Sequence, residues 1–570
     1  MRENKDLEAE IHPLKNDEVR NRDANEVSNR HKETKIKPLR KFGQLSRCRT
    51  AAFFLVLFLS LIVVFAFSFI IPCPVRPVSQ RTWTRTFENA VSYPFLTLWD
   101  VNRDKVTDVI FTFKYSNDSN INGSCVAEGF SSPCAYVTVL SGTNGNLLWQ
   151  RALADDIQHL QCGIENLNGS KSSGCLVIGT PHLLTAINSS GETLWILKTS
   201  FAVGLSVIGP TLILPDLDGD DVGDLLIFFT PTDQVSSATK LIFRLLSGRS
   251  GDPIGQEVHH NVTERFVHFN PLIHITNTGA YYILFIQGTV QGVALKDIYI
   301  QATGIPLPAV KLNAVFLKSD PEWEKKTDPV SRKIEISSSR AAKYLQQVDV
   351  PGKNAGTLLI STKNMVELFD GQSLQNYWHH NTSEIQGAPV SGYFNMDDVS
   401  DFLIEDFIEK NRKKVTIVDG KSGTILWEED LICRTNCPQP VSINTVSQST
   451  FLFWGELPMQ TNGSVPEDLT ESRHYLYMVH PSHPNVILEL KNSTENVLAF
   501  TTALFEKSRH ACNVLLTGQP IGSEPGLLTI TKQKLKKAIS LSTVRRLNKG
   551  HDDLSDDEIK KYLYIMRYKS

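Results

Sequence analysis

The chain has no marked excess of charge of either sign. Its 570 residues include 58 lysines and arginines against 61 aspartates and glutamates, and the formal net charge at pH 7 is −3. Nucleic-acid-binding proteins usually carry a clustered basic surface that attracts the phosphate backbone. A chain so close to neutrality offers no such general attraction, and we therefore expect no nucleic-acid partner.

The sequence also lacks the short motifs of common catalytic sites. It has no Gly-x-Ser-x-Gly, no His-Glu-x-x-His and no complete P-loop. The Gly-Lys-Ser at 420–422 matches the end of a P-loop, but Val415 stands where the first glycine is needed. The paired histidines at 259–260 and 379–380 each precede a glycosylation sequon and are interpreted as surface loop residues. We therefore expect no catalytic residues and no enzymatic activity.

Charge is missing altogether from one segment, residues 51–71. At about 1.5 Å rise per residue, a helix of this length spans roughly the 30 Å hydrocarbon core of a bilayer, and Pro72 ends it. We predict a transmembrane signal anchor at 51–71. A cleaved signal peptide is the alternative, but it would have a shorter apolar run nearer the N-terminus and a small-residue cleavage site.

The charges that flank this segment predict its orientation. Eight lysines and arginines lie between residues 30 and 49 with Glu33 as the one acidic residue, whereas three arginines lie between 72 and 88. The positive-inside rule places residues 1–50 in the cytosol and 72–570 outside the cell or in a lumen. The first 50 residues are polar and almost without aromatics, so we predict a disordered cytosolic tail.

Two further patterns agree with a lumenal or extracellular location of the large C-terminal part. The nine cysteines include three pairs that are close in sequence, and short-loop disulfides suit an oxidising compartment. Cys73 and Cys512 could pair with each other, remain free thiols or form a disulfide between two chains, and the sequence does not decide between these states. Cys48 could be palmitoylated or remain an unmodified thiol. The candidate disulfides are Cys125–Cys134, Cys162–Cys175 and Cys433–Cys437; the Asn-x-Ser/Thr sequons, all after the apolar segment, are Asn117, Asn122, Asn168, Asn188, Asn261, Asn381, Asn462 and Asn492.

A short pattern with glycine and tryptophan recurs along this part of the chain. A small or polar residue is followed by Gly, two turn residues, usually a second Gly, and an apolar stretch that ends in Trp. The clearest copies are 141–149, 370–378 and 419–427, and shorter or degraded copies are 188–195 and 247–251. Each follows a β-rich run, so the pattern predicts a hairpin whose tryptophan packs between neighbouring sheets.

An acidic loop precedes two of these hairpins. Oxygen-bearing side chains stand at loop positions 1, 3, 5 and 9, directly before an apolar strand, and alternate positions on a tight turn point at one centre. Calcium needs six to eight such oxygens. An EF-hand is excluded because its bidentate Glu would fall on Phe111 or Ile227, whereas a solvated acidic turn without metal remains the alternative. We predict structural calcium at Asp216, Asp218, Asp220 and Asp224 and at Asp100, Asn102, Asp104 and Asp108, and a weaker site at Asn395, Asp397 and Asp401.

The repeats predict the fold and the domain boundaries. They recur every 45–65 residues from about residue 95 to 530, each with three or four short strands, and radial repetition of small antiparallel sheets is a β-propeller. We predict an all-β propeller of seven blades, with eight as the alternative, behind one transmembrane helix. A helix at 336–347 is the one expected exception among the strands, and residues 312–345 are predicted to form an irregular insertion. An open β-solenoid is the alternative. The predicted boundaries are a tail at 1–50, an anchor at 51–71, a stalk at 72–90, a propeller at 91–530 and a C-terminal segment at 531–570.

The Asp-x-Asp/Asn-x-Asp-x-x-x-Asp loops resemble the FG-GAP repeats of integrin α-subunit propellers. The stretches at 71–74, 282–285 and 515–518 are similar to a family of single-pass membrane proteins called family with sequence similarity 234, and within it to the member A branch. The resemblance implies a cytosolic N-terminus and a propeller ectodomain with integrin-like FG-GAP repeats. It implies no activity, and it extends the calcium role to the loops at 100 and 216.

We therefore expect a membrane-tethered, non-enzymatic glycoprotein whose calcium-supported propeller binds protein at the cell surface or in the secretory pathway. One alternative is a trafficking or accessory partner of another membrane protein. A remote alternative is a quinone-dependent enzyme, because the Gly-turn-Trp hairpin also resembles blades of quinone-dependent dehydrogenases. A fold of this kind says little about the partner.

Overall fold

The structure is a computed structural model of the full chain, and its description is confined to part of it. The predicted tail before residue 45, most of the predicted stalk with Cys73, and Asn117, Asn122 and Asn462 lie outside the described residues. The described residues are 45–70, 82–116, 125–169, 173–180, 182–198, 204–231, 239–262, 269–305, 317–337, 341–350, 353–409, 411–434, 437–458, 474–493, 495–505, 510–547 and 554–569.

The chain forms two compact units, Met1–Pro77 and Val78–Ser570. The first contains α1 (Leu45–Ile70), which covers the uncharged segment almost to its end, and the structure describes the side chains of its residues 51–65. No helix within the described part of the chain is both long and apolar enough to span a membrane.

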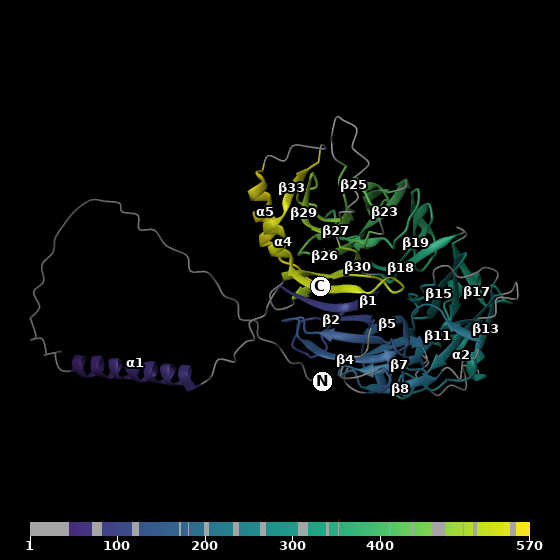
Figure 1. Cartoon of the computed structure of the whole chain (residues 1–570), viewed down its shortest axis with the longest axis horizontal. Coiled ribbons are helices and arrows are strands. Elements are labelled where there is room, and N and C mark those ends of the chain that lie inside the picture. Colours follow the sequence, from purple (N-terminus) through teal and green to yellow (C-terminus); the bar gives the residue numbers. More distant parts are fainter. Residues whose placement is uncertain are drawn as a thin grey trace, which may run out of the picture. The chain divides into compact units, whose positions relative to one another are not determined.

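The second unit consists of small antiparallel sheets that follow one another along the chain (Figure 1). Most strands pair with the next strand in sequence; β9, which pairs with β11, and β33, which pairs with β29, are exceptions. Six of the sheets are β5 (Asp156–Ile164), β6 (Gly174–Thr180), β7 (His182–Asn188), β8 (Thr193–Lys198); β9 (Leu205–Val207), β10 (Leu212–Ile213), β11 (Leu225–Pro231), β12 (Thr239–Leu246), β13 (Val258–Val262); β14 (Leu272–Ile275), β15 (Tyr281–Gln287), β16 (Thr289–Ala294), β17 (Lys333–Ser337); β18 (Ala342–Val350), β19 (Lys353–Thr362), β20 (Met365–Asp370), β21 (Asn376–Asn381); β22 (Val390–Gly392), β23 (Asp401–Glu409), β24 (Arg412–Val418), β25 (Ile425–Ile432); and β26 (Val441–Asn444), β27 (Ser449–Gly455), β28 (His474–Val479), β29 (Val486–Ser493), β33 (Thr543–Arg546).

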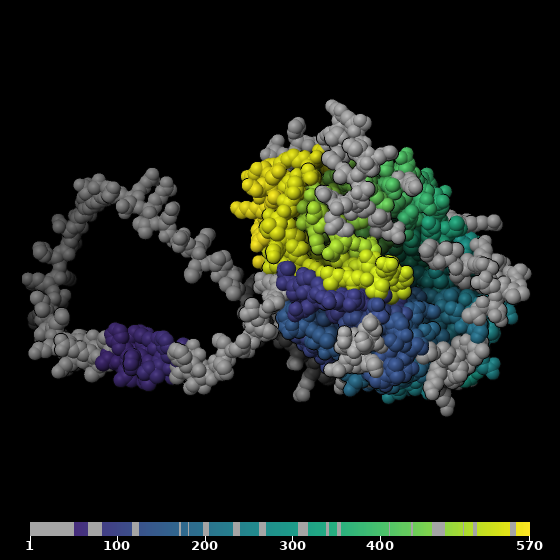
Figure 2. All heavy atoms as spheres, in the orientation of Figure 1, coloured from purple at the N-terminus to yellow at the C-terminus, as the bar shows by residue number. Residues whose placement is uncertain are grey.

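The seventh sheet joins the two ends of this unit through its first strand, β1 (Trp83–Trp99). The N-terminal half of β1 pairs with β32 near the C-terminus, and its C-terminal half pairs with β2, with an irregularity between Ser92 and Leu96. Figures 1 and 2 show β1 in purple against the yellow C-terminal strands. The remaining strands of this sheet are β2 (Asp108–Tyr115), β3 (Ala135–Leu140), β4 (Leu147–Ala154), β30 (Val497–Phe505), β31 (His510–Thr517) and β32 (Gly526–Lys534).

The core lies between neighbouring sheets. The second and third strands of a sheet are apolar on both faces, and β11 is buried from Leu225 to Phe229. One cluster packs Ile227 and Phe229 of β11 against Leu176 and Ile178 of β6. Strands buried on both faces read as continuous apolar runs, which is why the sequence shows such runs rather than strict alternation.

Tryptophans link several of the sheets to the next, as the hairpin pattern predicted. In most of these contacts, the indole N–H of a tryptophan on the last strand of one sheet donates to a carbonyl in the turn between the third and fourth strands of the following sheet. Trp323 acts in the same way from α3 (Pro321–Lys326), which precedes β17. Trp83 of β1 instead donates to the turn between β3 and β4 of its own seven-stranded sheet. The contacts are Trp83 to Gly142 at 3.2 Å, Trp149 to Ser189 at 2.8 Å, Trp195 to Gly248 at 3.1 Å, Trp323 to Gln372 at 2.9 Å, Trp378 to Gly420 at 2.8 Å and Trp427 to Pro484 at 2.9 Å.

Some expectations from the sequence differ from the structure. The predicted helix at 336–347 is wrong, because β17 and β18 cover most of these residues and pair in two different sheets. The described helices in this unit are α2 (Leu295–Thr303), α3, α4 (Leu535–Leu541) and α5 (Asp556–Ile565). β1 begins within the residues predicted as a stalk, and β33 of the predicted C-terminal segment pairs with β29.

Among the described residues, three disulfides join the cysteines that the sequence pairs by proximity: Cys125–Cys134, Cys162–Cys175 and Cys433–Cys437. The second joins directly paired residues of β5 and β6. Cys512 is buried on β31 and belongs to none of them.

Candidate metal centre

The acidic loops lie where the antiparallel topology brings two connections together. In a four-stranded meander, the loop between the first and second strands and the turn between the third and fourth lie at the same end of the sheet. We call this the acidic-loop end. The loop before β11 therefore meets the turn between β12 and β13, and the loops before β2 and β23 meet the corresponding turns of their own sheets.

The aspartate at loop position 9 ties the loop to this turn. Asp224 is fully buried; its Oδ2 accepts the N–H of Leu217 at 2.6 Å, and its Oδ1 accepts the N–H of Gly248 at 3.2 Å. A Cβ on Gly248 would lie 2.0 Å from the carbonyl oxygen of Gly223, so the turn requires glycine there. Asp108 and Asp401 make the same pair of contacts, to Val101 and Gly142 and to Phe394 and Gly420.

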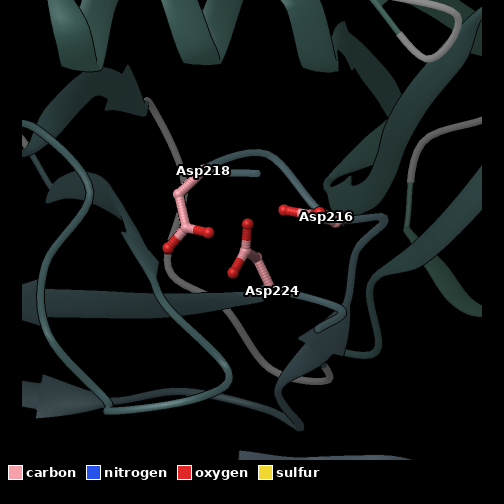
Figure 3. Close-up of side chains that lie close together, drawn as sticks. All are labelled: Asp216, Asp218 and Asp224. Carbon is pink, nitrogen blue, oxygen red and sulfur yellow. The ribbon is translucent and has the colours of Figure 1, made fainter. Parts of the chain in front are cut away.

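Three carboxylates of the 216 loop gather at one point. Single oxygens of Asp216, Asp218 and Asp224 all lie within 4.8 Å of one another, and Figure 3 shows the three groups turned toward each other. Oxygens that ligate one calcium at about 2.3–2.6 Å lie at most about 5 Å apart. The three carboxylates therefore fit a shared hard cation.

The electrostatics of this group also favour a cation. Burial and the nearby carboxylates of Asp218 and Asp216 raise the pKa of Asp224 to about 7, although the N–H groups of Leu217 and Gly248 act in the opposite direction. Burial and the carboxylates of Asp220 and Asp216 likewise raise the pKa of Asp218 against hydrogen bonds from Ser247 and Asp220. Carboxylates held together raise one another's pKa because each disfavours the ionised form of its neighbour, and a bound cation relieves this repulsion.

Asp220, the fourth predicted ligand of this loop, has a different partner. Its Oδ2 accepts the Nε–H of Arg249 at 3.1 Å, and Ser247 donates to the same oxygen at 3.3 Å. The other oxygen accepts the N–H of Val222 at 2.9 Å. The structure thus places Asp220 in an ion pair beside the three gathered carboxylates.

The loop at 100 is not gathered in this way. Two groups of three acidic side chains have oxygens within 4.8 Å of one another in the described chain, and neither includes a residue of this loop. Asp100 accepts the N–H groups of Asp104 and Lys105, and Asp104 accepts the hydroxyl of Thr143 at 3.0 Å. Burial raises the pKa of Asp108 to about 6.

A buried ammonium lies beside the 100 loop. Lys532 of β32 is fully buried, and its Nζ donates to the carbonyl oxygens of Gly142 at 3.0 Å and Thr107 at 3.4 Å. Burial lowers the pKa of Lys532, while Cys512, Asp108 and Asp104 act to raise it. This loop thus has a cation from the protein itself.

The second gathered group contains a residue that the sequence pattern missed. Asp397, Asp401 and Asp419 bring oxygens within 4.8 Å, and Asn395 donates its amide to Asp419 at 3.0 Å. Burial acts to raise the pKa of Asp419, but hydrogen bonds that include those from Ser422 and Asn395 outweigh it and lower the pKa. The sequence does contain a signal for this residue. Asp419 directly precedes the first glycine of its hairpin turn, the position that Ser141 and Ser247 occupy in the other two hairpins.

Comparison with known proteins identifies the family. A family model described as FAM234A/B beta-propeller matches residues 83–569. The chain belongs to the FAM234A/B family. It is 38% identical to Protein FAM234A of Homo sapiens over 577 residues, which cover both chains fully, and 33% identical to Protein FAM234B of Homo sapiens over 538 residues, 92% of this chain and 83% of that one.

The repeated sheets of this family member are accordingly those of a β-propeller. Solved structures with similarity to it include the WD40 domain of SCAP from fission yeast, with a TM-score of 0.38, 10% identity, and 79% of this chain and 98% of that chain covered. A europium-containing methanol dehydrogenase has a TM-score of 0.42, 8% identity, and 80% and 94% covered. Likenesses of this size say nothing about chemistry.

Proposed function

We propose that this FAM234 protein is a non-enzymatic, single-pass membrane glycoprotein whose calcium-supported propeller binds another protein at the cell surface or in a secretory-pathway membrane. Three features support the proposal: the uncharged segment that α1 covers, the one-sided distribution of the sequons, and the absence of a catalytic motif from the sequence. The observation that carries the calcium part is the gathering of Asp216, Asp218 and Asp224 at the acidic-loop end.

We also infer that the propeller has eight blades. Each of the six separate sheets supplies one blade. The seven-stranded sheet supplies two, because β1 is the fourth strand beside β30, β31 and β32 and the first strand beside β2, β3 and β4. An N-terminal strand that completes the last blade closes the ring without a free edge.

Asp216, Asp218 and Asp224 would hold the calcium of this proposal. Bound there, the ion would neutralise the carboxylates and join the loop to the turn through Asp224, which already contacts both Leu217 and Gly248. Among the four predicted ligands of this loop, Asp220 is paired with Arg249, which leaves Asp216, Asp218 and Asp224 for the ion.

Calcium binding is tested by thermal unfolding of the full-length protein with calcium and with chelator. We expect calcium to raise the melting temperature of the wild type and to have little effect on Asp216→Asn. Asp221→Asn is the matched control, because Asp221 is exposed, lies outside the group and has a φ of 64° that asparagine also tolerates. Equal melting of wild type with calcium and with chelator would contradict the calcium proposal.

The binding role is tested by proximity labelling from the propeller in intact cells. We expect protein neighbours at the cell surface or in the secretory pathway that are lost when the acidic-loop end is altered. A single stable neighbour that is an integral protein of the same membrane would instead favour a trafficking or accessory role. A coloured purified protein would contradict a non-enzymatic role and favour a bound quinone.

A further inference from the structure

Five of the eight sequon asparagines lie in the described residues, and they occupy two different structural settings. Three are exposed on the strand that is fourth in the order of its sheet: Asn261 on β13, Asn381 on β21 and Asn492 on β29. The other two, Asn168 and Asn188, are half-buried beside connections at the acidic-loop end.

The strand asparagines have room for a large substituent. β13 and β21 are edge strands of their sheets, and β33 covers β29 only from Val486 to Glu489, short of Asn492. On β13 the side chains alternate, with His260 buried and Asn261 exposed. An exposed asparagine on the outermost strand directs its amide away from the core.

Asn188 has both ends of its amide engaged in a tight turn. Its Oδ1 accepts the N–H groups of Ser190 and Glu192, each at 2.9 Å, and its Nδ2 donates to Oε2 of Glu192 at 2.9 Å. The ring of Trp149 packs against the same turn, where a Cβ on Gly191 would lie 2.9 Å from it. A sugar on Nδ2 would disturb a turn that is built on this side chain.

Asn168 is confined by the neighbouring sheet. It has a φ of 61° in the short 3-10 turn Leu167–Gly169, and its N–H donates to the carbonyl of Gly248 at 3.3 Å. A Cβ on the adjacent Gly169 would lie 3.1 Å from the guanidinium of Arg249. A glycan at Asn168 would compete for space with the turn that bears this arginine.

The two settings lie at opposite ends of the sheets. Asn168 follows β5 and Asn188 ends β7, so both lie at the acidic-loop end of their sheet. Asn261, Asn381 and Asn492 are in the last residues of fourth strands, which run away from that end in an antiparallel meander. The fourth strands that bear them belong to every second sheet along this part of the chain.

We propose that Asn261, Asn381 and Asn492 carry N-linked oligosaccharides, and that Asn168 and Asn188 do not. In the transfer, the side-chain nitrogen forms a bond to C1 of the sugar, the bond from C1 to the pyrophosphate of a lipid-linked donor breaks, and the amide loses one proton. Among the described sequons, this leaves the acidic-loop end free of sugar and open to a protein partner. The inference rests on the lumenal or extracellular placement in the proposed function.

The test is glycopeptide mass spectrometry on full-length protein from mammalian cells, together with gel mobility of single variants. We expect sugar on the three strand sites, and one band step lost in each of Asn261→Gln, Asn381→Gln and Asn492→Gln. Ser170→Ala and Ser190→Ala remove the other two sequons while keeping Asn168 and Asn188, and we expect both to migrate like the wild type.

The outcomes separate this inference from the topology on which it rests. Sugar at Asn168 or Asn188 to the same extent as at the strand sites overturns the inference and leaves the lumenal placement intact. Strand sites without sugar, while any other sequon carries it, overturn the inference in the same way. A protein without sugar on any sequon overturns both.

Discussion

At the residue scale, burial of the His260 side chain makes the stability of the fold depend on pH. Burial lowers the pKa of His260 to about 4, and the charges of Lys333 and His259 add to this effect. Its ring packs on Phe243, with ring centroids 4.7 Å apart. The folded protein therefore keeps His260 neutral at a pH at which the unfolded chain already binds a proton.

This predicts acid destabilisation with a definite sign. The pKa of His260 in the folded protein lies below its value near 6.5 in the unfolded chain. Its contribution to the free energy of unfolding is therefore full above about pH 6.5 and is lost as the pH falls toward 4. The loss is at most about 3 kcal/mol. His260→Phe keeps the ring and cannot be protonated, so its melting temperature should fall less than that of the wild type between pH 6.5 and 4.5. The exposed neighbour gives the control: His259→Phe should retain most of the wild-type slope, because burial contributes most and His259 least among the causes that lower the pKa of His260. Equal slopes for all three proteins would refute the assignment.

At the element scale, the Gly-turn-Trp hairpin joins consecutive blades. Trp195 of β8 donates to the turn of the next blade, and a Cβ on Gly251 would lie 2.5 Å from its ring. Gly251 also has a φ of 74°, which alanine adopts at a cost of about 1–2 kcal/mol. The spacing of glycine and tryptophan in sequence thus has two causes, a left-handed turn residue and a close ring.

Separating these causes gives a prediction for the hairpin. Gly251→Ala should lower the free energy of unfolding by the cost of the left-handed φ plus about 1–3 kcal/mol from overpacking against Trp195. Gly522→Ala is the matched control, because Gly522 also has positive φ, at 91°, but no atom lies within 4 Å of its Cβ direction. Denaturant unfolding measures both, and an equal loss in the two variants would show that the ring contributes nothing.

At the scale of the whole molecule, Lys532 connects β32, near the C-terminus, to the loop before β2 and to the turn between β3 and β4. It lies in β32 and donates to carbonyls of Thr107 and Gly142, which are more than 350 residues away in sequence. Lys532→Met removes a donor from both carbonyls. Gly142 keeps the indole N–H of Trp83, whereas the carbonyl of Thr107 loses the bond from Lys532, at about 1–3 kcal/mol for a buried group left unsatisfied. The denaturant midpoint should therefore fall with or without calcium. Lys537→Met, on the exposed side of α4, should leave the denaturant midpoint unchanged. If Lys532→Met had the same midpoint as this control, the contacts of Lys532 with Thr107 and Gly142 would not stabilise the fold.

The sequence alone determined the features that depend on neighbours along the chain. The β-rich runs, the glycine turns and the three short-loop disulfides each follow from residues close together along the chain, because local backbone preference and short loops set them. The sequence also predicted that the tryptophans pack between sheets, but the carbonyls that they contact are 40 or more positions away. The same reasoning failed at 336–347, where an apparent helical pattern lies in β17 and β18, since pairing with other strands overrides local propensity.

Only the tertiary structure decided which acidic loop gathers its carboxylates. The loops at 100 and 216 share one pattern, yet Asp216, Asp218 and Asp224 converge while the loop at 100 lies beside the ammonium of Lys532. The side chains that distinguish the two loops lie far from them in sequence: Arg249 lies in the turn of the same sheet as the 216 loop, and Lys532 comes from β32 near the C-terminus. The pairing of β1 with both β2 and β32 has the same origin, because only folding brings the C-terminal strand β32 beside it.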